Sequence, residues 1–243
     1  DLGANPLEMQ ARTRVNGTEV EITELFVAQK NLVAARGTGR AVLGKSPKLT
    51  QARIEVDALQ FPAAYTSFLQ LALAATDFGT LQTTGSASGS VEIADNAIVR
   101  AEGKLEGLTL EDTNGKFSMQ GMTGELHWAA SERAAVAASY LAWNSGSAYG
   151  LSGGRTRIDF ATRGRGFALT KPARVPVLDG AIILDALSVA SLGSPDTELT
   201  FDGRIEPISM PLLSKAFGWP ELNGQLAGRI PGLTYRNREL TVE

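Results

Sequence analysis

The sequence predicts an all-β protein, mainly antiparallel, with an extended, curved and twisted sheet or an open half-barrel groove built of hairpins and two short helices. Apolar and polar residues alternate with a period of two over most of the chain. Turn dipeptides such as Asn-Gly separate the alternating segments. Many strands carry Gly and Ala on one side, which favours bending of the sheet.

The composition narrows the class of protein. The chain has 243 residues, of which 43% are hydrophobic and 20% charged, which is the balance of a folded protein. The net charge of -3 gives no broad cationic field, so we expect no nucleic-acid partner. The absence of cysteine excludes disulfides, thiolate catalysis and cysteine-ligated zinc.

The clearest hairpin surrounds Asn16-Gly17, a dipeptide that favours a two-residue type I′ turn. Pairing Val15 with Thr18 places arginines opposite glutamates on one face and fairly apolar residues on the other. The expected pairs are Arg14 with Glu19, Arg12 with Glu21, Thr13 with Val20 and Ala11 with Ile22.

Further hairpins and strands continue this pattern. A turn at Asp95-Asn96 is expected to bring Val91 and Ile93 opposite Val99 and Ala97, and a turn at Asn114-Gly115 to bring Leu110 opposite Met119. Other predicted strands are Arg157 to Phe160, Ala181 to Leu184, Glu198 to Ile205, Gly224 to Ile230 and Glu239 to Glu243. Sequential hairpins of this kind form a meander.

Two helices are predicted, Ala63 to Thr76 after Pro62, and Pro211 to Phe217 before Gly218. The apolar stretch from Phe61 to Phe78 is interrupted by five polar residues, so we expect a packed helix and not a membrane span.

The chain is predicted to contain two degenerate units of strand, helix and hairpin, at about 51-110 and 198-243. The turn at Asn96 corresponds to Asn237 in the second unit. The chain starts at Asp1 without a leader and stops at Glu243 within an alternating pattern, so we expect residues 1-243 to be a fragment of a larger β-groove protein.

The search for catalytic chemistry finds no complete arrangement. His127 is the only histidine, and it alternates with Leu126 and Trp128, so we expect a surface histidine with no role as base or ligand. The pair Glu111-Asp112 adjoins a turn and is interpreted as a solvated hairpin end. We therefore predict no enzyme activity, no cofactor and no metal.

Four arginines form a local basic alternation that could meet lipid head groups or form the wet face of a strand. They are Arg155, Arg157, Arg163 and Arg165.

Three stretches carry a family resemblance. They are Gly107-Leu-Thr-Leu-Glu-Asp with Gly121-Met-Thr-Gly-Glu-Leu-His-Trp128; Val175-Pro-Val-Leu-Asp-Gly180; and Ile205-Glu-Pro-Ile-Ser through Ala216-Phe-Gly-Trp-Pro220 to Gly228-Arg-Ile-Pro-Gly232. They resemble the C-terminal region of YdbH-type proteins in the AsmA-like superfamily, and the likeness extends loosely over most of the chain. Phe217-Gly-Trp-Pro to Ile230-Pro-Gly is the most specific part.

The resemblance implies a periplasmic protein of a Gram-negative bacterium, held in the inner membrane by an N-terminal anchor that these residues lack. Its apolar β-groove would transport phospholipid between the inner and outer membranes. The resemblance therefore implies phospholipid or another acyl-chain ligand as partner. The alternative is a structural or assembly domain of the cell envelope that acts through protein partners.

The groove lining is predicted from strand alternation, because a path for acyl chains needs a continuous apolar face with a polar outside. The candidates are Ile54, Val56, Val91, Ile93, Leu110, Met119, Ile182, Leu184, Phe201, Ile205, Leu226 and Ile230. The same residues could instead fill a sandwich core or lie under a helix. Unpaired strand edges predict an edge-to-edge dimer of the fragment.

Overall fold

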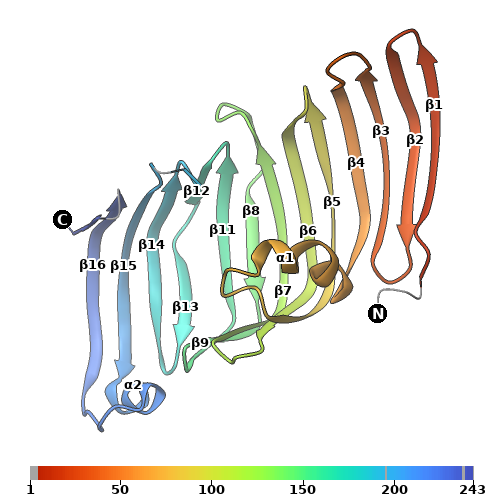
Figure 1. The fold of residues 1–243 in the computed structure, drawn as a ribbon. Helices are drawn as coiled ribbons and strands as arrows, with labels where there is room; N and C mark the ends of the chain where they lie inside the picture. The colour runs from red at the N-terminus through yellow and green to blue at the C-terminus, as the bar shows by residue number, and fades with distance from the viewer. Residues whose placement is uncertain (1–4, 195, 237–238, 243) are drawn as a thin grey trace.

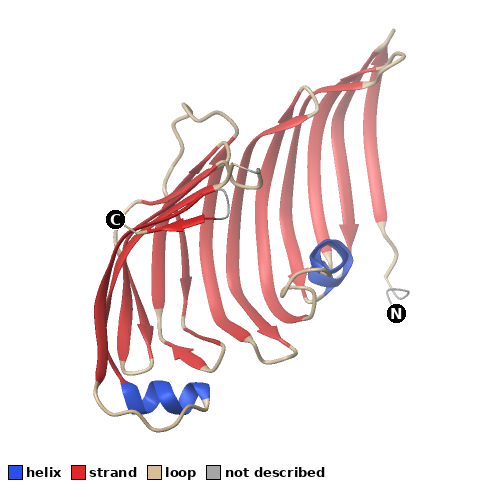
Figure 2. Ribbon diagram, turned by 60° about the vertical axis from the view of Figure 1, so that its left-hand side comes forward, coloured by secondary structure: helices blue, strands red, loops and turns tan. Residues whose placement is uncertain are grey.

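The computed structural model describes residues 5–194, 196–236 and 239–242. In this part of the chain, seventeen strands belong to a single sheet, with helical segments only between β4 and β5 and between β15 and β16 (Figure 1). The sheet is almost entirely antiparallel and curves into an open trough, as Figure 2 shows from the side. The predicted fold class is confirmed.

The first nine strands are β1 (Glu8–Asn16), β2 (Glu19–Gln29), β3 (Val33–Val42), β4 (Lys48–Phe61), β5 (Leu81–Ala94), β6 (Ala97–Asp112), β7 (Phe117–Ala129), β8 (Ser139–Trp143) and β9 (Ser145–Ala148). The remainder are β10 (Leu151–Gly153), β11 (Thr156–Arg163), β12 (Gly166–Leu169), β13 (Ala173–Val177), β14 (Gly180–Ala190), β15 (Glu198–Ser209), β16 (Gln225–Arg236) and β17 (Glu239–Thr241). Glu243, at the end of the last predicted strand, lies outside the described residues.

The strands form a meander in which most neighbours in the chain are neighbours in the sheet. β1 to β7 pair consecutively. Two short strands, β8 and β9, then share the edge of β7, and the series continues through β11 to β14, β15 and β16. One short parallel contact joins Trp128 of β7 to Thr162 of β11, where the loop after β7 leaves a gap before β8 begins.

The pairing gives the sheet two chemically different faces. Ile54 lies opposite Val91, which lies opposite Ala101, which lies opposite Trp128; we call the face that these residues share the apolar face. The residues between them in the chain, such as Arg53, occupy the other side, which we call the ionic face. Because opposed residues in an antiparallel pair point to the same side, this assignment extends across the sheet.

The sheet has very little buried interior. The accessible surface of the chain is 15059 Å², whereas a compact protein of the same mass exposes about 10,400 Å². In the described part of the chain, the largest fully buried side chains are the serines Ser139 and Ser214. The sheet is therefore a single layer, mostly without a second layer packed on it.

The first helical region begins at Ala63, as predicted, but ends at Leu73, before the predicted Thr76. After Ala63 and Ala64 it consists of a π-helical turn, Tyr65–Leu69, and α1, Gln70–Leu73. No side chain caps either piece at its N-terminus, and after Leu73 the Thr76 N–H and hydroxyl both bond the Leu73 carbonyl, which closes the segment in a turn. The Tyr65 hydroxyl joins the two ends of the insertion, since it donates to Phe78 O and accepts from Leu81 N.

The second helix confirms the prediction almost residue for residue. α2 spans Met210–Phe217, with Pro211 in its first turn and Gly218 at φ 66° as the left-handed C-cap. Strand, helix and further strands occur in that order in both predicted units; that the units are copies of one repeat stays a prediction. Asn237 lies outside the described residues.

The predicted hairpin registers are partly wrong. Across the first turn Val15 pairs with Val20, not Thr18, because Asn16 already pairs with Glu19 and the loop is Gly17 and Thr18. The shift of two residues keeps each side chain on its face but changes its partner.

Of the two later hairpins, one has a register that differs from the prediction and one has the predicted pair. Asp95 and Asn96 both have positive φ, as a type I′ turn requires. Because Ala94 pairs with Ala97 across this turn, Ile93 lies opposite Ile98, and a bulge between Glu92 and Ile93 then leaves Val91 opposite Ala101, so the predicted partners are wrong. The predicted pair Leu110 and Met119 is confirmed.

Candidate functional site: an open apolar face

The structure places all twelve predicted lining residues on the apolar face, at different points along the trough. None of them is buried: eleven are partly exposed, and Leu226 is 39% exposed. They do not fill a sandwich core, because the described residues form one sheet and no second sheet covers it. The alternation in the sequence therefore marks a face that solvent reaches.

The N-terminal group lies on β4 and β5 and faces glycines on β3. Ile54 is opposite both Gly37 and Val91, and Val56 lies one step along the same side of β4. A side chain on Gly37 would place its Cβ 2.9 Å from Arg53 O, so the two strands approach too closely for one. Small residues on this side are consistent with the inward curvature of the sheet.

The C-terminal group lies on β14, β15 and β16. Ile182 is opposite Ile205, and Leu184 and Ile230 flank Gly203 from either side. Phe201 pairs with Leu187 and Leu233, which extends the apolar face toward the far strand ends. This group gives the trough a second apolar wall.

A hollow of about 280 Å³ lies on the apolar face between these groups, and its lining is almost entirely apolar. Sequence reasoning missed its residues Leu105, Leu126, Leu141 and Phe160. The signal was present, because charged Glu102, Lys104, Glu106 and Glu125 alternate with the apolar positions on β6 and β7. With these residues, the apolar face is continuous from β4 to β16.

The helical segment after β4 covers one end of the apolar face. Leu110 and Met119 lie at this end, where Phe78 packs edge-to-face on Phe117 with ring centroids 5.3 Å apart. Figure 1 shows α1 in front of the lower ends of β5 to β7. The apolar face is therefore partly closed here and open along the remainder of the trough.

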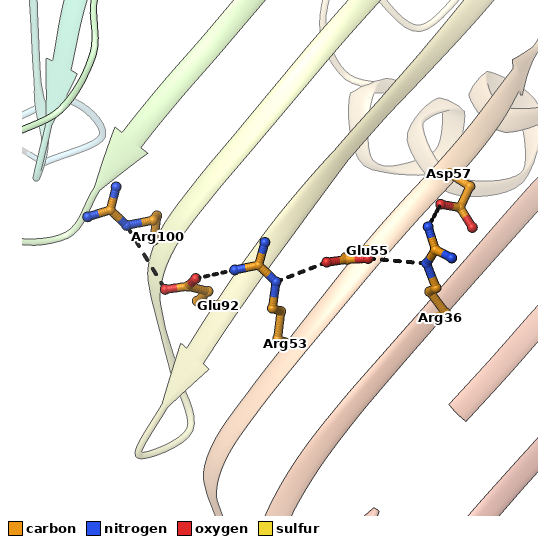
Figure 3. Close-up of polar contacts among 6 residues, drawn as sticks. All are labelled: Arg36, Arg53, Glu55, Asp57, Glu92 and Arg100. Atoms are coloured by element: carbon orange, nitrogen blue, oxygen red, sulfur yellow. Dashed lines mark hydrogen bonds and ion pairs between the residues drawn. The ribbon is translucent and has the colours of Figure 1, made fainter. Parts of the chain in front are cut away.

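The ionic face satisfies its own charges. Arg36 bonds Glu55 at 3.1 Å and Asp57 at 2.9 Å, and Arg53 bonds Glu55 at 3.1 Å and Glu92 at 2.6 Å. Figure 3 shows this row, which ends at Arg100. The hydrogen bond between Arg53 and Glu55 raises the pKa of the guanidinium and lowers the pKa of the carboxyl.

The single histidine lies on the ionic face, opposite Glu102 in the register, whereas Leu126 and Trp128 point to the apolar face. Its ring nitrogens are 4.0 Å from Glu102 and 3.9 Å from Glu125. The described residues contain no group of three or more His, Cys, Asp or Glu side chains placed to hold a metal ion.

The predicted solvated pair Glu111-Asp112 needs correction. Asp112 is only 3% exposed and accepts hydrogen bonds from the Lys116 N–H at 3.0 Å, the Thr80 hydroxyl at 3.0 Å and the Asn114 amide at 3.3 Å. These bonds, that from Lys116 foremost, lower the pKa of the carboxyl. Asp112 ties the turn after β6 to the base of the helical segment, which a single sequence does not reveal.

The four arginines of the basic alternation do not form one group. Arg157 bonds Asp159 at 2.9 Å and lies over the Tyr140 ring, and Arg165 donates to the Leu192 carbonyl at 2.8 Å. Arg155 lies in the break between β10 and β11, and Arg163 is exposed at the end of β11.

Comparison with known proteins gives no match to a family model, a curated protein or a solved structure. Among the described residues, no helix combines the length and apolar character needed to cross a bilayer. The candidate site is therefore defined by its own geometry: an apolar trough with a self-paired ionic exterior.

Proposed function

We propose that this chain is a periplasmic segment of an AsmA-like protein that transports phospholipid between the inner and outer membranes, with its apolar face as the path for acyl chains. One observation carries the proposal. The apolar face runs over successive strands and remains partly exposed, while the opposite face pairs its charges. The inner-membrane anchor implied by the resemblance is part of the proposal.

The chemistry of the face suits a flexible, unbranched hydrocarbon. Removal of a methylene group from water is worth about 0.8 kcal/mol, so several methylenes on a face with no catalytic group give useful affinity. The lining of the central hollow offers almost no hydrogen-bonding surface. It would therefore hold acyl chains without fixing their position, as a transport path requires.

A structural or assembly role in the envelope is the second candidate, and the free edge of β1 favours it. All nine residues of Glu8–Asn16 are exposed, and within the described chain this strand pairs only with β2. An unpaired edge is a template for another strand. In this role the edge-to-edge dimer would be the functional species, and a strict monomer in sedimentation would count against it.

The test is native mass spectrometry of protein purified from a bacterial periplasm, with identification of the lipids extracted from it. Phe201→Asp places a charge on the apolar face, and we expect it to lower bound phospholipid at least about tenfold, since it removes a large apolar contact. Thr200→Asp is the matched control, because Thr200 is the next residue on the same strand and points to the ionic face.

Near-stoichiometric phospholipid in wild type and Thr200→Asp, but not in Phe201→Asp, supports the transport role. Lipid-free wild-type protein would contradict the transport role and favour the structural role. Equal loss of bound phospholipid in both variants, with folding retained by circular dichroism, would do the same.

A further inference from the structure

Both helical segments lie at the same end of the strands. α1 follows β4 and α2 follows β15; Figure 1 shows α1 in front of the lower part of β5 to β7 and α2 below the lower end of β15. We call segments 62–80 and 210–224, with Tyr149 between them, the helical rim. Many of its large apolar side chains are exposed to solvent and are not among the residues that line the groove.

The exposed side chains of the helical rim are large and often aromatic. Leu71 is 92% exposed, Phe68 53% and Trp219 52%. The others are Leu69, Phe78, Tyr149, Leu212, Phe217 and Leu222. Exposed large apolar residues near the opposite ends of the strands include the aliphatic side chains Leu43, Ile98 and Leu192.

Direct contacts join the parts of the helical rim. Asp77 bonds Lys116 at 2.6 Å, and the carbonyl of Lys116 accepts from the Tyr149 N–H at 2.7 Å. A Cβ built on Gly150 would lie 2.9 Å from Ala216 O, so the turn after Tyr149 directly abuts the end of α2. The exposed residues therefore belong to one connected edge of the molecule.

The α2 end of the helical rim is held rigidly. The buried Ser214 hydroxyl accepts from the Leu222 N–H, and the Ser214 carbonyl accepts from the Trp219 N–H at 2.9 Å. Trp219 stacks on Phe217 with ring centroids 4.9 Å apart. The indole is thus presented to solvent by a fixed turn.

The helical rim has few charges and no positive excess. Segments 62–80 and 210–224 contain Asp77, Glu221 and Lys215; Asp77 is paired with Lys116, and Asp179 accepts a hydrogen bond from the Ser209 N–H at the start of α2. A surface without an excess of cations gains no electrostatic attraction to an anionic bilayer, so a contact made by apolar side chains favours a zwitterionic one. Exposed Trp, Tyr and Phe beside a short amphipathic helix such as α2 are typical of residues that enter the membrane interface.

We propose that the helical rim is a membrane-contact surface that inserts Leu71 and Trp219 into the interface of a zwitterionic phospholipid bilayer. The first helical segment also covers one end of the apolar face, but Leu71 and Trp219 are not among the residues that line the groove. A membrane-bound protein with an empty groove, or a lipid-filled groove on a protein that does not bind membranes, would separate the two proposals.

The test is flotation with phosphatidylcholine vesicles, with and without phosphatidylglycerol. We expect wild type to float with both, and Leu71→Asp/Trp219→Asp to lose bound fraction by about tenfold or more, because two apolar insertions are removed. The matched control is Leu43→Asp/Leu192→Asp in the loops at the opposite rim, with side chains of similar exposure, 47% and 58%. We expect it to float like wild type.

Fluorescence gives a second readout that does not depend on a charged variant. Trp219 is the exposed member of three tryptophans, so its emission should shift to shorter wavelength and be quenched by brominated phosphatidylcholine. Trp219→Phe should abolish both changes while Trp128 and Trp143 still emit.

Three outcomes would overturn the proposal: no flotation of wild type, equal loss in the opposite-rim control, or binding only to vesicles with phosphatidylglycerol. Self-association abolished by Leu71→Asp/Trp219→Asp without flotation would assign the helical rim to a protein contact instead.

Discussion

On β4, Arg53 and Glu55 alternate with Ile54 and Val56. The two charged side chains form ion pairs with their neighbours, whereas the two aliphatic side chains are only partly covered by theirs. Glu55 is paired with Arg36 of β3 at 3.1 Å and Arg53 with Glu92 of β5 at 2.6 Å, and the two also bond each other. The aliphatic residues contact their cross-strand neighbours but remain partly exposed. One strand thus supplies a face that is chemically complete and a face that can accept a further apolar group.

This contrast shows where the stability of a single-layer sheet comes from. With few buried side chains, backbone ladders and close strand contacts contribute most of the order, and exposed ion pairs contribute little individually. Perturbations of backbone packing on the apolar face should therefore have larger effects than the loss of a charge on the ionic face.

The largest effect is expected at Gly203. Its added Cβ would lie 2.5 Å from Ile183 O and 2.6 Å from the Phe201 ring. We expect Gly203→Ala to lower the free energy of unfolding by about 1–3 kcal/mol in urea denaturation, since backbone must move. Gly228, on the same face of the neighbouring strand, has no atom within 4 Å of its added Cβ, so Gly228→Ala should be close to neutral. Equal losses would show that space is not the cause.

An intermediate effect is expected at Asp112, the buried carboxylate that neither face exposes. Its folded-state pKa is lowered below the ordinary 3.8, so its stabilisation is present above that pH and is lost as the pH falls through the folded-state pKa. Asp112→Asn should destabilise the protein at neutral pH, and the difference from wild type should shrink in urea titrations at about pH 3. A difference independent of pH would assign the effect to shape alone.

The smallest effect is expected on the ionic face. Arg36 is exposed and bonds Glu55 and Asp57, so Arg36→Gln should change the free energy of unfolding by less than about 1 kcal/mol. About 1 M salt should reduce this change further, because exposed charges are screened. A larger or salt-independent loss would mean that the row in Figure 3 acts as a cooperative network.

Alternation predicted the face of each lining residue because a period of two survives a shift of two in pairing, as at Val15. The partners themselves were less predictable, since bulges such as that beside Ile93 depend on local backbone geometry that the residue types do not specify. The central hollow at Leu105 and Leu126 could have been predicted from the same alternation. The burial of Asp112 could not, because its local partners Asn114 and Lys116 indicate only a turn, whereas Thr80 is brought to it by the end of the helical insertion.

Most strands between β1 and β7 pair only with the strands before and after them. The contacts at one edge of the sheet therefore do not depend on the number of strands between the two edges. Energies in such an array are sums of nearest-neighbour terms. A hairpin inserted or removed in phase with the alternation leaves both faces continuous. The architecture consequently has no intrinsic length: its reach can be adjusted in steps of one hairpin without redesign of what remains.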